Sequence, residues 1–140
     1  MDSESAIVLI AMHPQYVDLI SQGIKKIEFR KTNFCRPVKK IVIYSTSPIK
    51  KIVGFFDVKK IESSTPNIFW EKYSSIGGIS RTAFFRYYNT SSIAIGIHIK
   101  KYTPLPHPIN LSSLGLTVPQ SYLYLTENQF DIIKRDIRCC

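Results

Sequence analysis

Three strand-like segments follow one another in the first half of this sequence with no helix between them. They cover residues 25–31, 38–45 and 51–62, and each carries Ile, Val or Phe in the short runs typical of strands. A doubly wound α/β sheet places a helix between successive strands, so this order excludes it. We expect a mixed α/β (α+β) fold, a small mixed or antiparallel β-barrel decorated by helices.

The remaining elements surround this block of strands. Residues 6–12 form a continuous apolar run, which predicts a central strand buried on both faces. Gly54 lies inside an apolar strand pattern and predicts a bulge or a close approach of another backbone or side chain. Strict alternation predicts a strand at 93–101, and the Pro-rich stretch 102–121 resembles a long ordered loop. Four helices are expected, at 14–22, 65–76, 80–88 and 126–136.

Length and charge bound the class of protein. The chain has 140 residues, so we expect one domain over 1–140, with a core at about 6–125 and a C-terminal helix at about 126–136. The net charge is +9, and residues 25–60 alone carry eleven Lys or Arg against two acids, a net of +9. Such a basic segment favours a polyanionic partner, nucleic acid before a membrane surface, although solvated lysines explain it equally well.

Cysteine and hydropathy patterns bear on location and cofactors. Cys35, Cys139 and Cys140 offer no disulfide framework, which favours a reducing, cytoplasmic compartment. No stretch approaches the roughly 20 apolar residues of a membrane span. The three histidines show no metal-ligand spacing, so we expect no metal and no other cofactor.

The stretch 23–31 concentrates charge directly after the first expected helix. If Lys25 is the first strand residue, alternation places Lys26, Glu28 and Arg30 together on one face and Lys25 on the other. A row of cation, anion and cation is either a solvated strand face or a pre-oriented polar site.

Two other segments offer polar side chains at expected turns or loops. Hydroxyls before a proline can bind a phosphate or base, but they also form turns, and a loop Gln-Ser-Tyr can either bind a base or hold the loop in place. Either segment can therefore be a binding site or local structure. These candidate residues are Ser45, Thr46 and Ser47, and Gln120, Ser121 and Tyr122.

The chain resembles the ASCH domain family of the PUA-like superfamily. Four pieces carry the resemblance, and together they span roughly residues 6–125: an apolar strand followed by Pro14-Gln15-Tyr16-Val17-Asp18-Leu19-Ile20, the signature Gly23-x-Lys25-x-x-Glu28-x-Arg30, the segment Ile43–Pro48 followed by Val53-Gly54, and Pro119-Gln120-Ser121-Tyr122-x-Tyr124-Leu125. The resemblance implies a small β-barrel whose cleft receives the signature residues, and binding of RNA or modified nucleobases. It also implies a second possibility, because one branch deacetylates acetylated cytidine with a Lys, a Thr three residues later and a distant Glu.

Glu28 departs from that enzymatic branch, because it stands where the amidohydrolases have threonine. The leading hypothesis is therefore an RNA-binding or modified-nucleotide-binding domain. In it Lys25 and Arg30 contact a phosphate or base acceptor, and Glu28 accepts from a base amino group or orients Arg30. The alternative is a small amidohydrolase or ribonuclease with Lys25 and Glu28 as catalytic residues. A protein-interaction module built on the aromatic helices, Phe69–Tyr73 and Phe84–Tyr88, is a third possibility, and the oligomeric state is open.

Overall fold

The structure, a computed structural model, describes residues 5–139, except for the side chains of residues 138 and 139. Cys140 lies outside the described residues, as do residues 1–4 of the expected domain. The elements are β1 (Ala6–Met12), α1 (Pro14–Ser21), β2 (Ile27–Arg30), β3 (Val38–Ser45), β4 (Lys51–Ser64), α2 (Pro66–Tyr73), α3 (Arg81–Tyr88), β5 (Ala94–Ile109), the 3₁₀ helix η2 (Leu111–Leu114), β6 (Tyr122–Leu125), α4 (Glu127–Lys134) and the 3₁₀ helix η3 (Arg135–Cys139).

The strands form one six-stranded sheet in the order β2-β5-β4-β3-β1-β6. β1 pairs in parallel with β3, and the other neighbours pair antiparallel. The mixed α+β class is confirmed. The barrel is not, because β2 and β6 lie at the two edges of an open sheet.

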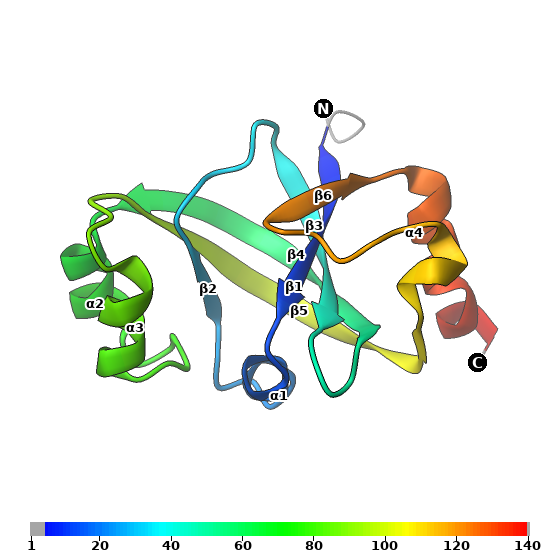
Figure 1. Ribbon diagram of the computed structural model, residues 1–140, viewed down its shortest axis with the longest axis horizontal. Helices are drawn as coiled ribbons and strands as arrows, with labels where there is room; N and C mark the ends of the chain where they lie inside the picture. The colour runs from blue at the N-terminus through cyan, green and yellow to red at the C-terminus, as the bar shows by residue number, and fades with distance from the viewer. Residues whose placement is uncertain (1–4, 140) are drawn as a thin grey trace.

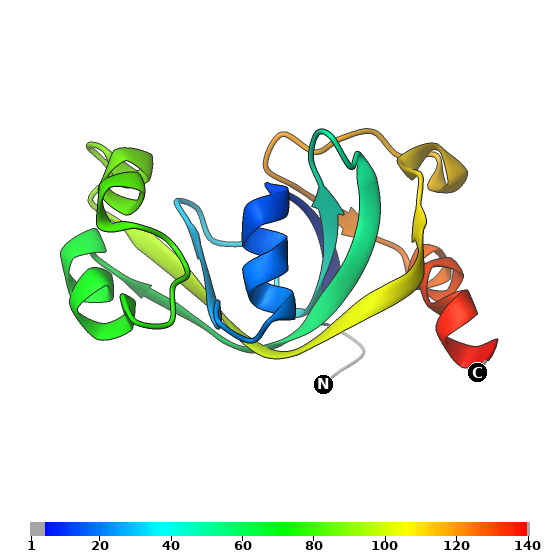
Figure 2. The same ribbon diagram turned by 90° about the horizontal axis from the view of Figure 1, so that it is seen from below.

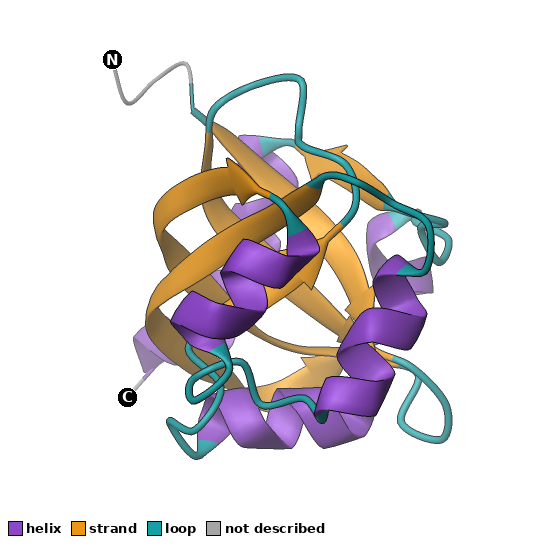
Figure 3. Cartoon of the chain, turned by 90° about the vertical axis from the view of Figure 1, so that its left-hand side faces the viewer, coloured by secondary structure: helices purple, strands orange, loops and turns teal. Residues whose placement is uncertain are grey.

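Two long strands, β4 and β5, run through the molecule from end to end (Figure 1). Helices α2 and α3 lie at one end and α4 at the other, while α1 lies between them (Figure 2). Viewed from the first end, α2 and α3 stand in front of the strands (Figure 3). The predicted loop at 102–121 is wrong in its first half, because residues 102–109 continue β5, and the short strand β6 was not expected.

Three clusters of buried side chains form the core. β1 divides its residues between two of them: Ile7 and Leu9 pack toward α4, and Val8 and Ile10 pack toward α1. The prediction of a strand buried on both faces is therefore confirmed. The third cluster joins β2 to the aromatic residues of α2 and α3, so most of these rings belong to the core.

The missing side chain at Gly54 allows β4 and β5 to approach closely. A Cβ atom built at this position would overlap the Tyr102 hydroxyl of the neighbouring strand, and the register of β4 against β5 shifts beside it. The sequence prediction of a bulge or close approach at Gly54 is confirmed.

Candidate functional site

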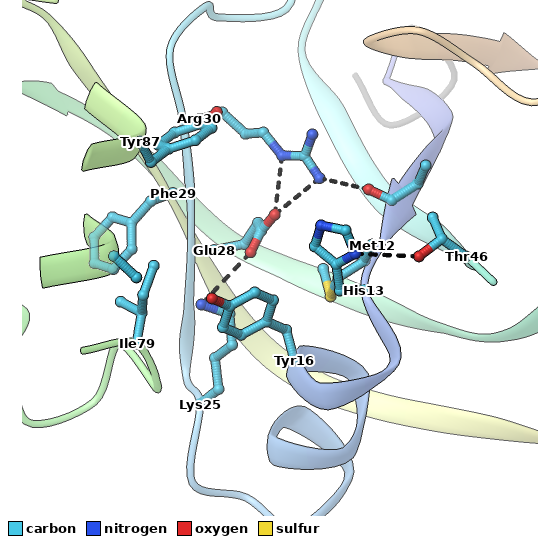
Figure 4. Close-up of a pocket in the computed structure, with 12 residues that line it drawn as sticks. Met12, His13, Tyr16, Lys25, Glu28, Phe29, Arg30, Thr46, Ile79 and Tyr87 are labelled. Atoms are coloured by element: carbon cyan, nitrogen blue, oxygen red, sulfur yellow. Dashed lines mark hydrogen bonds and ion pairs between the residues drawn. The ribbon is translucent and has the colours of Figure 1, made fainter. Parts of the chain in front are cut away.

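A cavity of about 400 Å³ opens where the edge strand β2 faces the end of β1 and the start of α1 (Figure 4). α3 closes one side, because a spacing of four residues places Ala83 and Tyr87 along one face while Phe84 and Tyr88 point into the core. Ile79, which precedes α3, lines the cavity beside them. The lining residues are Ala11, Met12, His13, Tyr16, Lys25, Glu28, Phe29, Arg30, Thr46, Ile79, Ala83 and Tyr87.

Glu28 lies at the centre of the charged groups. Its Oε2 accepts from Arg30 Nε at 2.9 Å and lies 2.8 Å from Arg30 Nη2, while its Oε1 lies 3.5 Å from Lys25 Nζ. The row of charges is therefore Lys25, Glu28 and Arg30. The predicted row beginning at Lys26 is wrong, because β2 begins at Ile27 and Lys26 is exposed, with its backbone N–H donating to Ile76.

Lys25 is a buried cation, with 3% of its surface exposed. Its Nζ donates to the Gly77 carbonyl at 2.6 Å and lies 5.4 Å from the ring centroids of Tyr16 and Phe29. Burial lowers the pKa of the Lys25 ammonium below 10.5, and Arg30 acts in the same direction, whereas the Glu28 carboxylate opposes the shift. The cavity therefore contains a desolvated amine held in place by a carbonyl and a carboxylate.

The Arg30 side chain connects β2 to β1, two strands that are not neighbours in the sheet. Its Nη2 donates to the Ala11 carbonyl of β1 at 3.0 Å, and its own carbonyl accepts from the Tyr88 hydroxyl at 2.9 Å. The side chain is 22% exposed. Among the described residues no hydrogen-bond partner lies at the other terminal nitrogen, Nη1 (Figure 4), so that end of the guanidinium can bind a ligand.

His13 and Thr46 form the opposite wall. His13 stands at the N-cap of α1 but makes no capping bond with its side chain; its Nδ1 lies 3.3 Å from Thr46 Oγ1 instead. Thr46 is held there because its backbone N–H donates to the Met12 carbonyl. Both side chains are polar groups at the mouth of the cavity.

The cavity includes Lys25, Glu28, Arg30 and Thr46, but not the other predicted site residues. Ser45 is buried at the end of β3 and Ser47 is exposed, and neither lines the cavity. Gln120, Ser121 and Tyr122 line a second cavity of about 270 Å³, of which Arg30 is also part.

Sequence reasoning missed His13, Tyr16 and Tyr87 as lining residues. Successive helical residues point about 100° apart, and the structure leaves Tyr87 38% exposed but Tyr88 only 1% exposed. The spacing of Ala83 and Tyr87 was the signal that could have separated the two tyrosines.

Two absences concern residues 5–139, the part of the chain that the structure describes. No helix there is long and apolar enough to cross a membrane. No group of three or more His, Cys, Asp or Glu in that range is arranged to hold a metal ion.

The fold and cavity define a small α+β protein with a charged, aromatic-lined pocket at one sheet edge. A family model described as the ASCH domain matches residues 10–106, and the chain belongs to this family. It is 26% identical over 127 residues to a protein of Zymomonas mobilis named ASCH domain-containing ribonuclease, a match that covers 86% of this chain and 85% of that protein. A crystal structure of ASCH from Zymomonas mobilis superposes with a TM-score of 0.83 at 25% identity, covering 90% of this chain and 92% of that one.

Two relatives from Ureaplasma parvum carry other names. One, named ATP synthase subunit alpha, is 30% identical over 124 residues, and one, named large ribosomal subunit protein uL22, is 30% identical over 120 residues. The chain spans only 16% and 39% of those two proteins, although the matches cover 87% and 84% of this chain. The similarity therefore concerns a part of each.

Proposed function

We propose that this protein binds single-stranded RNA. A nucleobase enters the cavity lined by Lys25, Glu28 and Arg30, which we call the main cavity. The observation that carries the proposal is the Lys25–Glu28–Arg30 row inside a pocket of about 400 Å³ that also contains aromatic rings. Unpaired bases are recognised by stacking on aromatic side chains and by hydrogen bonds to their edges, and this pocket offers both. The name of the Zymomonas mobilis relative supports RNA as the ligand class.

Each group has a role in this proposal. The free Nη1 of Arg30 donates to a phosphate or a base acceptor. Glu28 Oε1 lies 3.5 Å from Lys25 Nζ, its one charged contact among the described residues, and accepts from a base amino group. The Lys25 ammonium holds that carboxylate in place by an ion pair. Tyr16 and Tyr87 supply faces on which a base can stack.

Titration of the protein with a fluorescently labelled single-stranded RNA at several salt concentrations tests the proposal. We expect log K to fall linearly with log salt, with a slope of about −0.7 per phosphate contacted. Arg30→Gln should weaken binding about tenfold, because it removes a charged contact to the ligand. Arg86→Gln is the matched control, since Arg86 is exposed on α3 and does not line the cavity. Absence of RNA binding by the folded wild type at low salt would overturn the proposal.

Ribonuclease activity is a second candidate, favoured by the relative's name and by the side chains at the cavity mouth. Cleavage through the ribose 2′-hydroxyl requires a group that accepts its proton and cations that stabilise the phosphorane. His13 is exposed at the mouth, and Arg30 and Lys25 are the cations nearest Glu28. His13→Ala should abolish RNA cleavage while His107→Ala, an exposed histidine on β5, leaves it intact; intact RNA after incubation with the wild type would reject this candidate.

Deacetylation of an acetylated nucleoside is the remaining alternative. It needs Lys25 Nζ as nucleophile, and the lowered pKa of this buried amine favours that role. Glu28, however, stands where that chemistry uses a threonine, and Nζ already donates to Gly77. Incubation with acetylated cytidine, read for loss of the acetyl group, tests the alternative directly.

A further inference from the structure

The second cavity adjoins the first one along a shared boundary. Arg30 and Tyr87 line both of them. The second cavity, of about 270 Å³, is completed by segments far apart in sequence, from β1, the end of β2, the loop after it and the residues that lead into β6. A ligand longer than one nucleotide can therefore continue from one cavity into the other past Arg30.

Two cations stand at this boundary. Arg30 presents its free Nη1 there, since its Nε and Nη2 are held by Glu28 and Ala11. Lys31 is exposed, with its Nζ 4.8 Å from the centroid of the Tyr87 ring, and no acid within residues 5–139 pairs with it. Neighbouring Arg and Lys donors that are not neutralised fit a phosphodiester.

Beyond the boundary the second cavity has the chemistry of a base site. Phe34 and Tyr122 lie edge to face with ring centroids 4.8 Å apart, and both line the cavity. Gln120 and Ser121 add an amide and a hydroxyl, which can bond the edge of a stacked base. A free nucleoside that fills the main cavity reaches neither these groups nor Lys31, because they line only the second cavity.

We propose that the second cavity is a nucleotide subsite: it takes the neighbour of the nucleotide in the main cavity, with the connecting phosphate against Arg30 and Lys31. The ligand class is then a single-stranded oligonucleotide of at least two residues, and not a nucleoside. This inference rests on the proposed RNA binding. It gives Gln120, Ser121 and Tyr122 a place in the same binding path as Lys25 and Glu28.

Chemical-shift titration of the ¹⁵N-labelled protein tests the subsite. The probes are 2′-O-methyl nucleoside 3′-monophosphates and the corresponding homodinucleotides, because methylation prevents attack by the 2′-hydroxyl and keeps the probes intact. We expect the dinucleotide to bind about tenfold tighter than the monophosphate, since one additional stacked base contributes about 1–3 kcal/mol. Only the dinucleotide should shift the amide signals of Gln120 and Ser121.

Three variants test which residues produce the tighter binding of the dinucleotide. Phe34→Ala should remove most of this gain and leave monophosphate affinity unchanged, because Phe34 lines only the second cavity. Lys31→Gln should weaken both probes, because both carry the phosphate that faces Lys31. Lys26→Gln removes the same charge from the same segment outside both cavities and should change neither affinity. A dinucleotide that binds no tighter than the monophosphate, or a Phe34→Ala variant that weakens both probes equally, would overturn the subsite alone. Failure of both probes to bind would overturn the proposed function together with it.

Discussion

Gly78 shows how much of the site depends on the backbone of the α2–α3 connection. Its φ is +61°, and a Cβ atom placed there would lie 2.7 Å from the Cβ of Lys25. A Cβ atom placed at the preceding Gly77 would lie 2.8 Å from the Phe29 ring, and the Gly77 carbonyl accepts the hydrogen bond from Lys25 Nζ. The two glycines therefore allow the connection to pack directly on the residues that form the cavity.

Gly78→Ala should accordingly destabilise the protein by more than the backbone conformation alone explains. A left-handed backbone costs a non-glycine residue about 1–2 kcal/mol, and overpacking against Lys25 adds about 1–3 kcal/mol. Gly115→Ala is the control, because Gly115 has a similar φ of +68° with nothing within 4 Å of the added Cβ. Urea denaturation of the two variants measures the difference in the free energy of unfolding. Equal losses would show that the contact with Lys25 does not resist the substitution.

The charged residues of the site were predictable as a set, but their geometry was not. The signature spacing identified Lys25, Glu28 and Arg30, and all three line the cavity. A regular strand from Lys25 would have separated it from Glu28 on opposite faces. The strand begins two residues later, because the Lys26 N–H bonds to Ile76 of the α2–α3 connection, a long-range contact that no local pattern encodes.

At the scale of elements, Glu62 of β4 fastens α2 to the sheet. Its carboxylate accepts from the Tyr73 hydroxyl at 2.6 Å, lies 2.8 Å from His98 Nε2 of β5 and 3.2 Å from Lys72 Nζ. The Tyr73 hydrogen bond, followed by those from His98 and Lys72, lowers the pKa of Glu62 from 4.5 to about 2. α2 in turn carries Phe69, which packs against Phe29 next to the cavity.

The depressed pKa of Glu62 gives a signed prediction for acid stability. The stabilisation from the ionised carboxylate is complete above pH 4.5 and is lost as the pH falls toward 2, because the unfolded chain takes up the proton first. Glu62→Gln should cost about 1–2 kcal/mol near neutral pH. The difference in unfolding free energy between wild type and variant should shrink between pH 4.5 and 2.

Urea denaturation over a series of pH values measures this difference. Glu71→Gln is the control, since Glu71 is exposed on α2 and makes no ion pair with any described residue. A constant difference between wild type and Glu62→Gln across the acid range would contradict the assignment.

The second half of β5 explains the main error about the fold. Pro104, Pro106 and Pro108 made residues 102–109 resemble a loop, because proline interrupts the pairing of a central strand. Residues of the same parity direct their backbone N–H groups to the same side of a strand. This half of β5 pairs only with β4, so three missing donors can face the unpaired side. Three prolines at alternate positions are therefore compatible with a strand that is paired on one side only. That this half of β5 has no neighbour on its other side follows only from the complete strand order.

At the scale of the whole molecule, lysine pairs lie at both ends of the β3–β4 hairpin. Lys39 and Lys40 form ion pairs with Glu127 and Asp57, respectively. The register places Lys40 opposite Asp57 and Ser45 opposite Lys51, so the Lys50–Lys51 pair lies at the other end of the β3–β4 hairpin from Lys39–Lys40. The composition predicts an excess of basic residues. Where these residues lie on the surface depends on the pairing of the strands that carry them. The cations nearest the cavities are Lys25, Arg30 and Lys31.

A single domain over the whole chain is a prediction that cooperativity can test. β5 contributes a buried residue to each of the three core clusters: Ala94 to the one under α2 and α3, Ile97 to the one under α1, and Leu105 to the one under α4. Loss of any cluster therefore removes support from a strand that the other two share. We expect one cooperative unfolding transition for residues 1–140.

Two fluorescence reporters at opposite ends of the sheet make this prediction measurable. Trp70, the single tryptophan, packs on Phe84 with ring centroids 5.1 Å apart and reports on the α2–α3 end. The double variant Trp70→Phe, Tyr124→Trp moves the reporter to β6, at the other edge of the sheet. Within each protein, the urea midpoint from tryptophan fluorescence should coincide with the midpoint from far-ultraviolet circular dichroism, because both ends unfold together. An earlier fluorescence transition for Trp70 alone would mean that α2, α3 and their side of the cavity form a separate, weaker unit.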